Sequence, residues 1–228
     1  MSDLLTLLNK VVGIVKDDSA KLVNPDDYEL KIAEALNTYS KHRPDTDVVD
    51  VTGNGGHDYD LPTGWSEGFS EIKSIEYPIG DIPATLLDPD TYEIYQNTTK
   101  KQVRLLNNSP AAADTFRITF TIPRTITTII ATDEDAFCRL VAALCLEDLA
   151  NAHTQTGDSV IGADSVNYRS KGSEFSARAK KLITLYKNHM GIKGDDITPA
   201  ASVIVDLDLK YPAGGERLTH PRWAREKR

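Results

Sequence analysis

Residues 116–149 read FRITFTIPRTITTIIATDEDAFCRLVAALCLEDL, and this stretch decides the fold because the spacing of its apolar residues changes within it. Over residues 116–122 apolar and polar side chains alternate strictly, which predicts a strand with one buried and one wet face. Over residues 137–149 apolar residues recur every three or four positions, which predicts an amphipathic helix. We place the start of this helix at Thr132, as an N-cap with Asp135 three residues on.

The opposite change occurs near Pro44. Residues 3–16 and the segment after Asn24 both show helical periodicity. Asn24 followed by Pro25 predicts an N-cap and a first helical position. Pro44 disfavours helical geometry at Arg43, so the second helix should end there.

Between these two changes of apolar spacing, the sequence predicts a series of short strands. The segment Gly53-Asn54-Gly55-Gly56 predicts a hairpin turn. Clusters of Pro, Gly, Asn and Asp separate the apolar runs, which is typical of antiparallel strands joined by tight turns. The predicted strands cover residues 47–51, 72–77, 91–95, 102–106 and 116–122.

A last helix should follow, with Phe175 and Met190 near the ends of its apolar face and Gly191 as a left-handed cap. The fold class we expect is α+β: a helical bundle of about four helices with an inserted small antiparallel β module and an extended C-terminal arm. The expected division is residues 1–43 and 132–192 for the bundle, 44–131 for the β module and 193–228 for the arm.

Charge and composition restrict the class of protein. The net charge is −8, while residues 210–228 carry six basic and two acidic residues, a local balance of +4. An acidic body repels nucleic-acid phosphates, so only the tail suits an anionic partner. No apolar run is long enough to span a membrane, and no Lys or Arg precedes the first leucines as a signal peptide would require. Cys138 and Cys145 are too far apart on one predicted helix for a disulfide, so we expect two buried thiols.

Catalytic patterns are not found in the sequence. It contains no GxSxG, GxxxxGK[ST] or HExxH motif. His57 lies between a glycine-rich segment and two aspartates, which could hold a metal but is more typical of a solvated turn. The acidic run from Asp133 to Asp135 is accounted for by the positive end of the helix dipole. We therefore expect no catalytic residue, no metal, no cofactor and no enzymatic activity.

The C-terminal arm is the candidate docking segment. Tryptophan and arginine are enriched at binding hot spots, and a tryptophan is unusual in a tail that stays unstructured. The alternative is a solvated chain end. The candidate residues are Tyr211, Arg217, Arg222, Trp223, Arg225, Lys227 and Arg228.

Several segments also recur together in one protein family. They are ALNTYSKHRP at 35–44, YDLP at 59–62, Gly64-Trp65, Gly68-Phe69-Ser70, IEYP at 75–78, TGD at 156–158 and DSVNYRSK at 164–171. In this order, over residues 25–190, the chain resembles the head–tail connector (adaptor) proteins of the necks of tailed bacteriophages.

The resemblance implies a structural virion protein, assembled in the host cytoplasm and located in the neck. It implies a homo-oligomeric ring, typically a dodecamer, that docks under the portal protein and continues the DNA channel towards a tail or stopper protein. DNA would pass without sequence-specific binding, no membrane would be involved, and the chain ends would reach the portal or a neighbouring subunit.

Two alternatives stay open. The chain could be another neck or tail-completion protein, because such proteins share the location and the lack of catalysis. It could also be a ligand-binding module whose β insert holds a carbohydrate or peptide. In that case Trp65, Tyr77, Tyr92 and Tyr95 would offer stacking faces, although cross-strand pairing explains them equally well.

Overall fold

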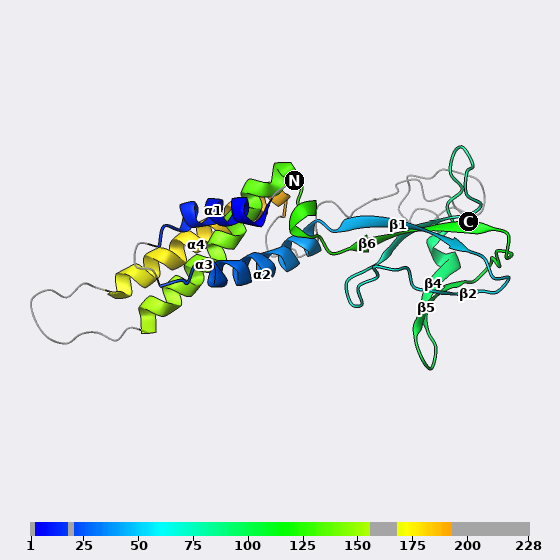
Figure 1. Ribbon diagram of the computed structural model, residues 1–228, viewed down its shortest axis with the longest axis horizontal. Coiled ribbons are helices and arrows are strands. Elements are labelled where there is room, and N and C mark those ends of the chain that lie inside the picture. Colours follow the sequence, from blue (N-terminus) through cyan, green and yellow to red (C-terminus); the bar gives the residue numbers. More distant parts are fainter. Residues whose placement is uncertain (1–2, 18–20, 156–167, 193–228) are drawn as a thin grey trace, which may run out of the picture.

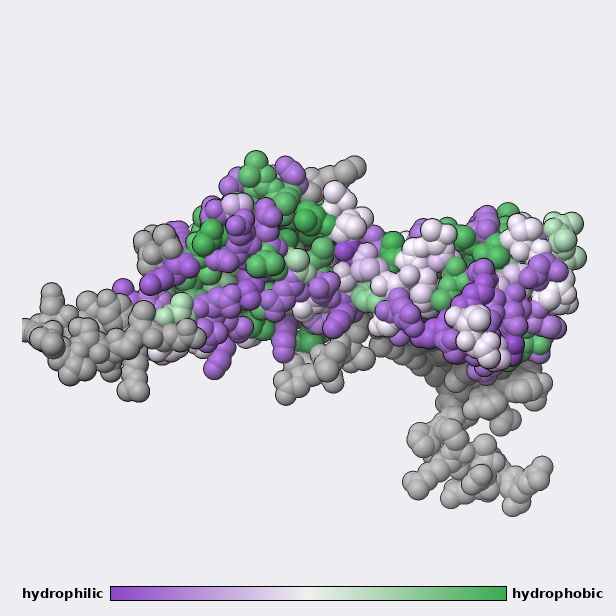
Figure 2. All heavy atoms as spheres, turned by 60° about the horizontal axis from the view of Figure 1, so that its bottom comes forward, coloured by the Kyte–Doolittle hydropathy of each residue, from purple (hydrophilic) through white to green (hydrophobic). Residues whose placement is uncertain are grey.

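The computed structural model describes residues 3–17, 21–155 and 168–192. These residues form an elongated molecule with four helices at one end and six strands at the other. A narrower waist separates the two masses (Figures 1 and 2). The fold class is α+β, as the change of apolar spacing predicts. We call α1–α4 the helical bundle and β1–β6 the β module.

The helical bundle is organised around one central helix. Its helices are α1 (Leu4–Val15), α2 (Asp26–His42), α3 (Glu134–Gln155) and α4 (Tyr168–Met190). The other three all pack on α3, and most of its side chains are buried. Tyr39 of α2 and Phe137 of α3 meet edge to face, with ring centroids 5.7 Å apart. The apolar periodicity of α3 thus reflects contacts on several sides of the helix.

The two cysteines lie in this core as expected. Cys138 and Cys145 are free thiols with 1% and 0% of their surface exposed. Burial raises the pKa of the Cys138 thiol to about 11 and that of Cys145 to about 12. Both therefore act as small apolar side chains.

The predicted helix starts at Asn24 and Thr132 are wrong by one to two residues. The first residue of α2 is Asp26, with Pro25 in the cap position, and the backbone N–H of Val23 donates to Asp27 Oδ2 at 2.7 Å. Thr132 lies inside a 3₁₀ turn, η3 (Ala131–Asp133), which leads into α3. Among the described residues no side chain caps the first turn of α2, and the Asp27 carboxylate binds the N–H of a residue before the helix, so Asn24 does not act as the cap.

The β module consists of two antiparallel three-stranded sheets. One has the order β1–β6–β3, with β1 (Asp45–Thr52), β6 (Thr115–Ile122) and β3 (Ile72–Glu76). The other has the order β2–β5–β4, with β2 (Asp58–Asp60), β5 (Lys101–Leu105) and β4 (Tyr92–Gln96). Each of the five predicted runs overlaps a strand to within one or two residues at its ends, while β2 carries no apolar run and was not predicted.

The predicted hairpin turn at residues 53–56 is wrong, because β1 and β2 belong to different sheets. The chain crosses from one sheet to the other here, and the backbone N–H of Gly53 donates to the Asp114 carbonyl at 2.9 Å. A Cβ atom at Gly53 would lie 2.2 Å from the carbonyl oxygen of Ala111. The glycine is needed for this close approach of two backbones.

The strongest predicted strand forms the centre of the module core. Phe116, Ile118 and Phe120 of β6 are fully buried, as the alternation predicts. Trp65 stacks on Phe120 with ring centroids 5.8 Å apart, so the loop after β2 closes one side of this core.

Candidate functional site

The residues predicted to carry docking lie outside the part of the chain that the structure describes. This holds for Tyr211, Arg217, Arg222, Trp223, Arg225, Lys227 and Arg228. The candidate site that the structure does describe is the waist, where α2 enters β1 and β6 leaves towards α3.

Arg124 joins the two chain crossings of the waist. Its Nε donates to the Arg43 carbonyl at 2.6 Å and its Nη2 to the Pro44 carbonyl at 3.2 Å. Its Nη1 donates to the carbonyl of Thr128 at 2.5 Å and lies 3.6 Å from Asp45 Oδ1. Only 11% of the side chain is exposed, so these charge-assisted bonds form away from most of the solvent. We call Arg124 with these four partners the junction.

A second polar group lies next to the junction, and we call it the Asp133 cluster. Asp133 Oδ2 accepts a hydrogen bond from the Tyr39 hydroxyl at 2.9 Å and lies 3.4 Å from Arg43 Nε. Asp133 Oδ1 lies 2.9 Å from His189 Nε2. The cluster therefore ties the ends of α2 and α4 to the turn that begins α3.

The environment fixes the ionisation of this cluster. Burial acts to raise the pKa of Asp133, but hydrogen bonds from His189 and Tyr39 and the charge of Arg43 outweigh it and leave that pKa below its usual value. Burial and the bond to Asp133 raise the pKa of Tyr39 to about 12. Asp133 is therefore a buried carboxylate with charged and neutral donors around it.

A neighbouring pair extends this network. His42 Nδ1 and the Tyr186 hydroxyl are 2.7 Å apart. Burial raises the pKa of Tyr186, while burial and the charges of Lys187 and Lys41 lower the pKa of His42. Both side chains are therefore uncharged at neutral pH, and the tautomer of His42 sets which of the two donates.

The arrangement favours a mechanical role over chemistry. Asp133 has 2% of its surface exposed and is surrounded by donors, so it has no free side towards a substrate. Among the described residues no group of three or more His, Cys, Asp or Glu side chains is placed to hold a metal ion. None of the described helices is long and apolar enough to cross a membrane.

This site was not predicted from the sequence. Asp133 was expected to complement the helix dipole, whereas the structure buries its side chain among partners 94 and 56 residues away. One signal in the sequence could have indicated the site. Tyr, His and Arg residues gather at the end of the second predicted helix, although packing against the bundle requires only apolar side chains there.

A loop far from the waist exposes apolar side chains. We call residues 78–85, between β3 and β4, the tip loop. Backbone bonds at its base and a bond of 2.8 Å from Thr85 Oγ1 to Asp81 Oδ2 order it. Ile82 is 99% exposed, and Leu86, just after the loop, is 58% exposed. These side chains contribute little to the core of the β module.

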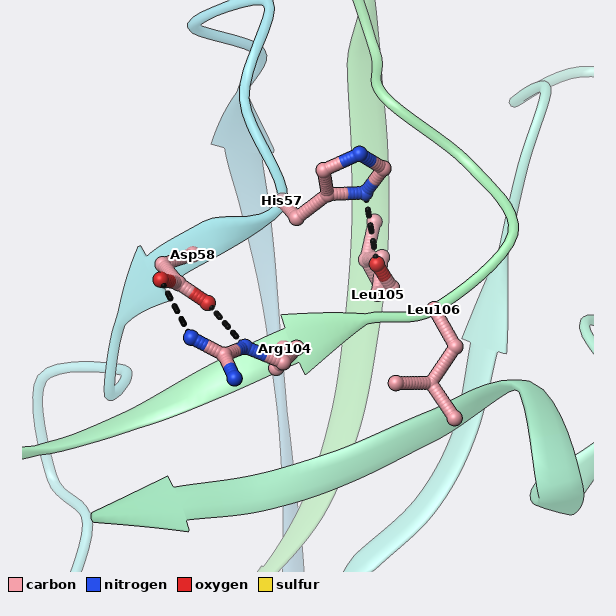
Figure 3. Close-up of a pocket in the computed structure, with 5 residues that line it drawn as sticks. All are labelled: His57, Asp58, Arg104, Leu105 and Leu106. Atoms are coloured by element: carbon pink, nitrogen blue, oxygen red, sulfur yellow. Dashed lines mark hydrogen bonds and ion pairs between the residues drawn. The ribbon is translucent and has the colours of Figure 1, made fainter. Parts of the chain in front are cut away.

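A shallow pocket of about 400 Å³ lies near the start of β2 and the end of β5 (Figure 3). Arg104 makes two bonds to Asp58, of 2.6 and 2.8 Å, and lies over the Tyr95 ring. His57 is exposed in a bend before β2, as the sequence suggested, and its Nδ1 also lies 2.8 Å from the Leu105 carbonyl oxygen. Arg104, Asp58 and this nitrogen are all engaged within the module.

The four aromatic residues considered for ligand stacking also have internal partners. Trp65 stacks on Phe120, and the Tyr77 hydroxyl donates to Asp114 at 3.1 Å. Arg104 covers Tyr95, and Tyr92 packs against the module core. Their positions are explained by the fold of the β module.

Comparison with known proteins gives distant structural neighbours. No protein-family model and no curated protein matches the chain. A chain from the virion of a native gene transfer agent particle is 10% identical, with a TM-score of 0.28, over 74% of this chain and 87% of that one. A chain from the neck of an empty particle, computed with C6 symmetry, is 8% identical, with a TM-score of 0.29 over the same shares. One from the neck of a native particle, computed with C12 symmetry, is 12% identical, with a TM-score of 0.26 over 80% and 94%. TM-scores this low do not establish a common fold.

Proposed function

We propose that this protein is a non-enzymatic structural component of a phage-type neck, where it bridges two partners. One observation carries the proposal: the junction and the Asp133 cluster fix a helical bundle and a β module into one elongated body. A rigid body with unlike surfaces at its two ends suits a spacer between different proteins. The sequence resemblance to head–tail connectors supplies the setting.

The finer proposal follows the same resemblance. The protein acts as an adaptor ring in the virion, docks under the portal, continues the DNA channel and meets a tail or stopper protein. The bundle (residues 1–43 and 132–192) forms the ring, and the inserted module (44–131) faces the next partner. The arm (193–228) docks through its arginines and Trp223 on the portal or a neighbouring subunit.

Electron microscopy of the purified full chain, alone and mixed with the portal protein, tests this proposal. We expect rings, alone or seated on the portal. A chain that stays monomeric in both samples would contradict the ring and the adaptor role together. Truncation after residue 213 should leave the fold intact and weaken docking or ring assembly, because this segment is poor in apolar residues.

A further inference from the structure

Charge is segregated among the helices of the bundle. Helix α4 has six basic residues and one acidic residue, Glu174, a net charge of +5. Helix α2 has four acidic and two basic residues, a net charge of −2, and α3 has four acidic and one basic, a net charge of −3. An acidic body thus contains one strongly basic helix.

Two lysines of α4, Lys180 and Lys181, lie on its solvent side. Residues spaced by three and four positions along this side are all exposed, and we call them the α4 stripe: Ala177, Lys180, Lys181, Thr184, Leu185 and Asn188. Leu185 is 38% exposed, and within the described residues no ion pair involves Lys180 or Lys181. The opposite side of the helix, with Ala179 and Tyr186, is buried in the bundle core.

Helix α2 presents the complementary surface. Its exposed residues between Asp26 and Asn37 form the α2 stripe: Asp26, Glu29, Leu30, Ala33, Glu34 and Asn37; Lys41, which is also exposed, lies beyond the end of the stripe. Leu30 is 68% exposed, and Asp26 and Glu29 form no ion pair within the described part of the chain. Lys31 pairs with Glu34 of the stripe and with Asp148 of α3, at 3.1 and 3.0 Å. Among the described residues Asp26 and Glu29 are therefore the unpaired carboxylates that make the stripe acidic. Each stripe is thus a charged row with an exposed leucine.

The two stripes lie on different sides of the molecule. Both helices pack on α3 and run towards the waist, where His42 and Tyr186 meet. Figure 1 shows α2 on the other side of α3 from α1 and α4. The stripes of one copy cannot cover each other.

We propose that the α4 stripe of one copy binds the α2 stripe of the next copy. Pairing α4 with α4 would bring lysines together, and pairing α2 with α2 would bring carboxylates together, whereas the mixed pair attracts. A contact between two different surfaces repeats head to tail and closes into a ring when the rotation allows. The proposal rests on the proposed function and names the surfaces that would build its ring.

Charge reversal tests the pairing. One variant carries Lys180→Glu and Lys181→Glu, and a second carries Asp26→Lys and Glu29→Lys. We expect each variant alone to self-associate at least tenfold more weakly than the wild type, measured by analytical ultracentrifugation at low salt. Mixed in equal amounts, the two should assemble again, since each then meets a surface of opposite charge. A single chain with all four changes should also assemble.

A control with Lys73→Glu and Lys100→Glu changes the net charge as much as the first variant but lies on the β module, off both stripes. It should assemble like the wild type. The control and the first variant should keep the wild-type denaturation curve because the changed side chains are exposed. The second variant should unfold at a somewhat lower denaturant concentration because its two carboxylates lie in the first turn of α2. Rings that survive both stripe variants would overturn this inference and leave the proposed function standing. A first variant that assembles normally but no longer binds DNA would assign the α4 stripe to nucleic acid instead. A wild type that never self-associates would overturn both.

Discussion

Arg124 stabilises the waist through bonds to three backbone carbonyls that belong to two separate crossings of the chain. In the Arg124→Ala variant these carbonyls lose their donors. We expect the free energy of unfolding to fall by about 3 kcal/mol, because a bond to a charged group is worth about 1.5–3 kcal/mol and the losses are not additive. Urea denaturation measures this.

Arg117 supplies the matched control for that experiment. It is an arginine on β6 that also makes paired bonds, to the carboxylate of Asp50, but it lies at the surface. The Arg117→Ala variant should therefore lose little stability. Equal losses in the two variants would show that the backbone bonds of Arg124 have no special weight.

Asp133 gives a dependence on pH whose sign follows from its environment. Its pKa is lower in the folded protein, so the unfolded state binds the proton first as the pH falls. Its stabilisation is full above the usual carboxyl pKa of about 4 and is lost below it. Asp133→Asn should cost about 2 kcal/mol at pH 7 and progressively less below pH 4.

Asp135, two residues on, is the control because its side chain is 79% exposed. Asp135→Asn should change the unfolding free energy little at either pH. If the two variants followed the same pH curve, burial of Asp133 in its cluster would not be the cause. Urea curves at pH 7 and at pH 3.5 make the comparison.

The residues of the waist also mark what the sequence could predict. Pro44 ends α2 by local geometry, and that prediction is confirmed. The burial of Asp133 depends on Tyr39 and His189, which reach it only after the bundle closes. Rules that use only neighbouring residues therefore predict the end of α2 correctly. They cannot predict the burial of Asp133, because it depends on residues distant in the sequence.

At the scale of the elements, the segment between β1 and β2 passes very close to the backbone at residues 110–111. A Cβ at Gly53 would overlap the carbonyls of Pro110 and Ala111, which belong to the fixed backbone. Gly53→Ala should therefore destabilise the protein by about 2–4 kcal/mol in urea denaturation. Gly13 in α1 has no atom within 4 Å of the equivalent position. Gly13→Ala should be neutral or stabilising by up to about 1 kcal/mol, and a destabilising Gly13→Ala would contradict the argument.

Strand positions and strand partners differ in how far the sequence predicts them. The alternation over β6 is a local property and gives its buried face correctly. Its partners β1 and β3 are set by contacts between distant segments, so the expected hairpin after β1 was wrong. The three residues of β2 pair with β5 without an apolar pattern of their own. Sheet order had to come from the structure.

For the whole molecule, the separation of the surfaces matters more than any single site. The stripes lie on the bundle, the tip loop belongs to the β module, and the junction joins the two bodies between them. A change at one surface should therefore leave the contacts of the other intact. Variants of the stripes should lose rings but keep the β module folded, and variants of the tip loop should keep rings and lose only the contacts of that loop.

Ile82 allows this separation to be tested at the far surface. Because its side chain is 99% exposed, Ile82→Asp should leave the free energy of unfolding within about 0.5 kcal/mol of the wild type. Burying that side chain in a partner is favourable by about 2 kcal/mol, so the variant should bind the downstream tail or stopper protein at least tenfold more weakly. Thr98→Asp, an exposed change in the turn between β4 and β5, adds the same charge and should bind normally. If the wild type and both variants bound equally and all formed rings, the tip loop would not be part of the interface. The proposed contacts between bundles would still stand.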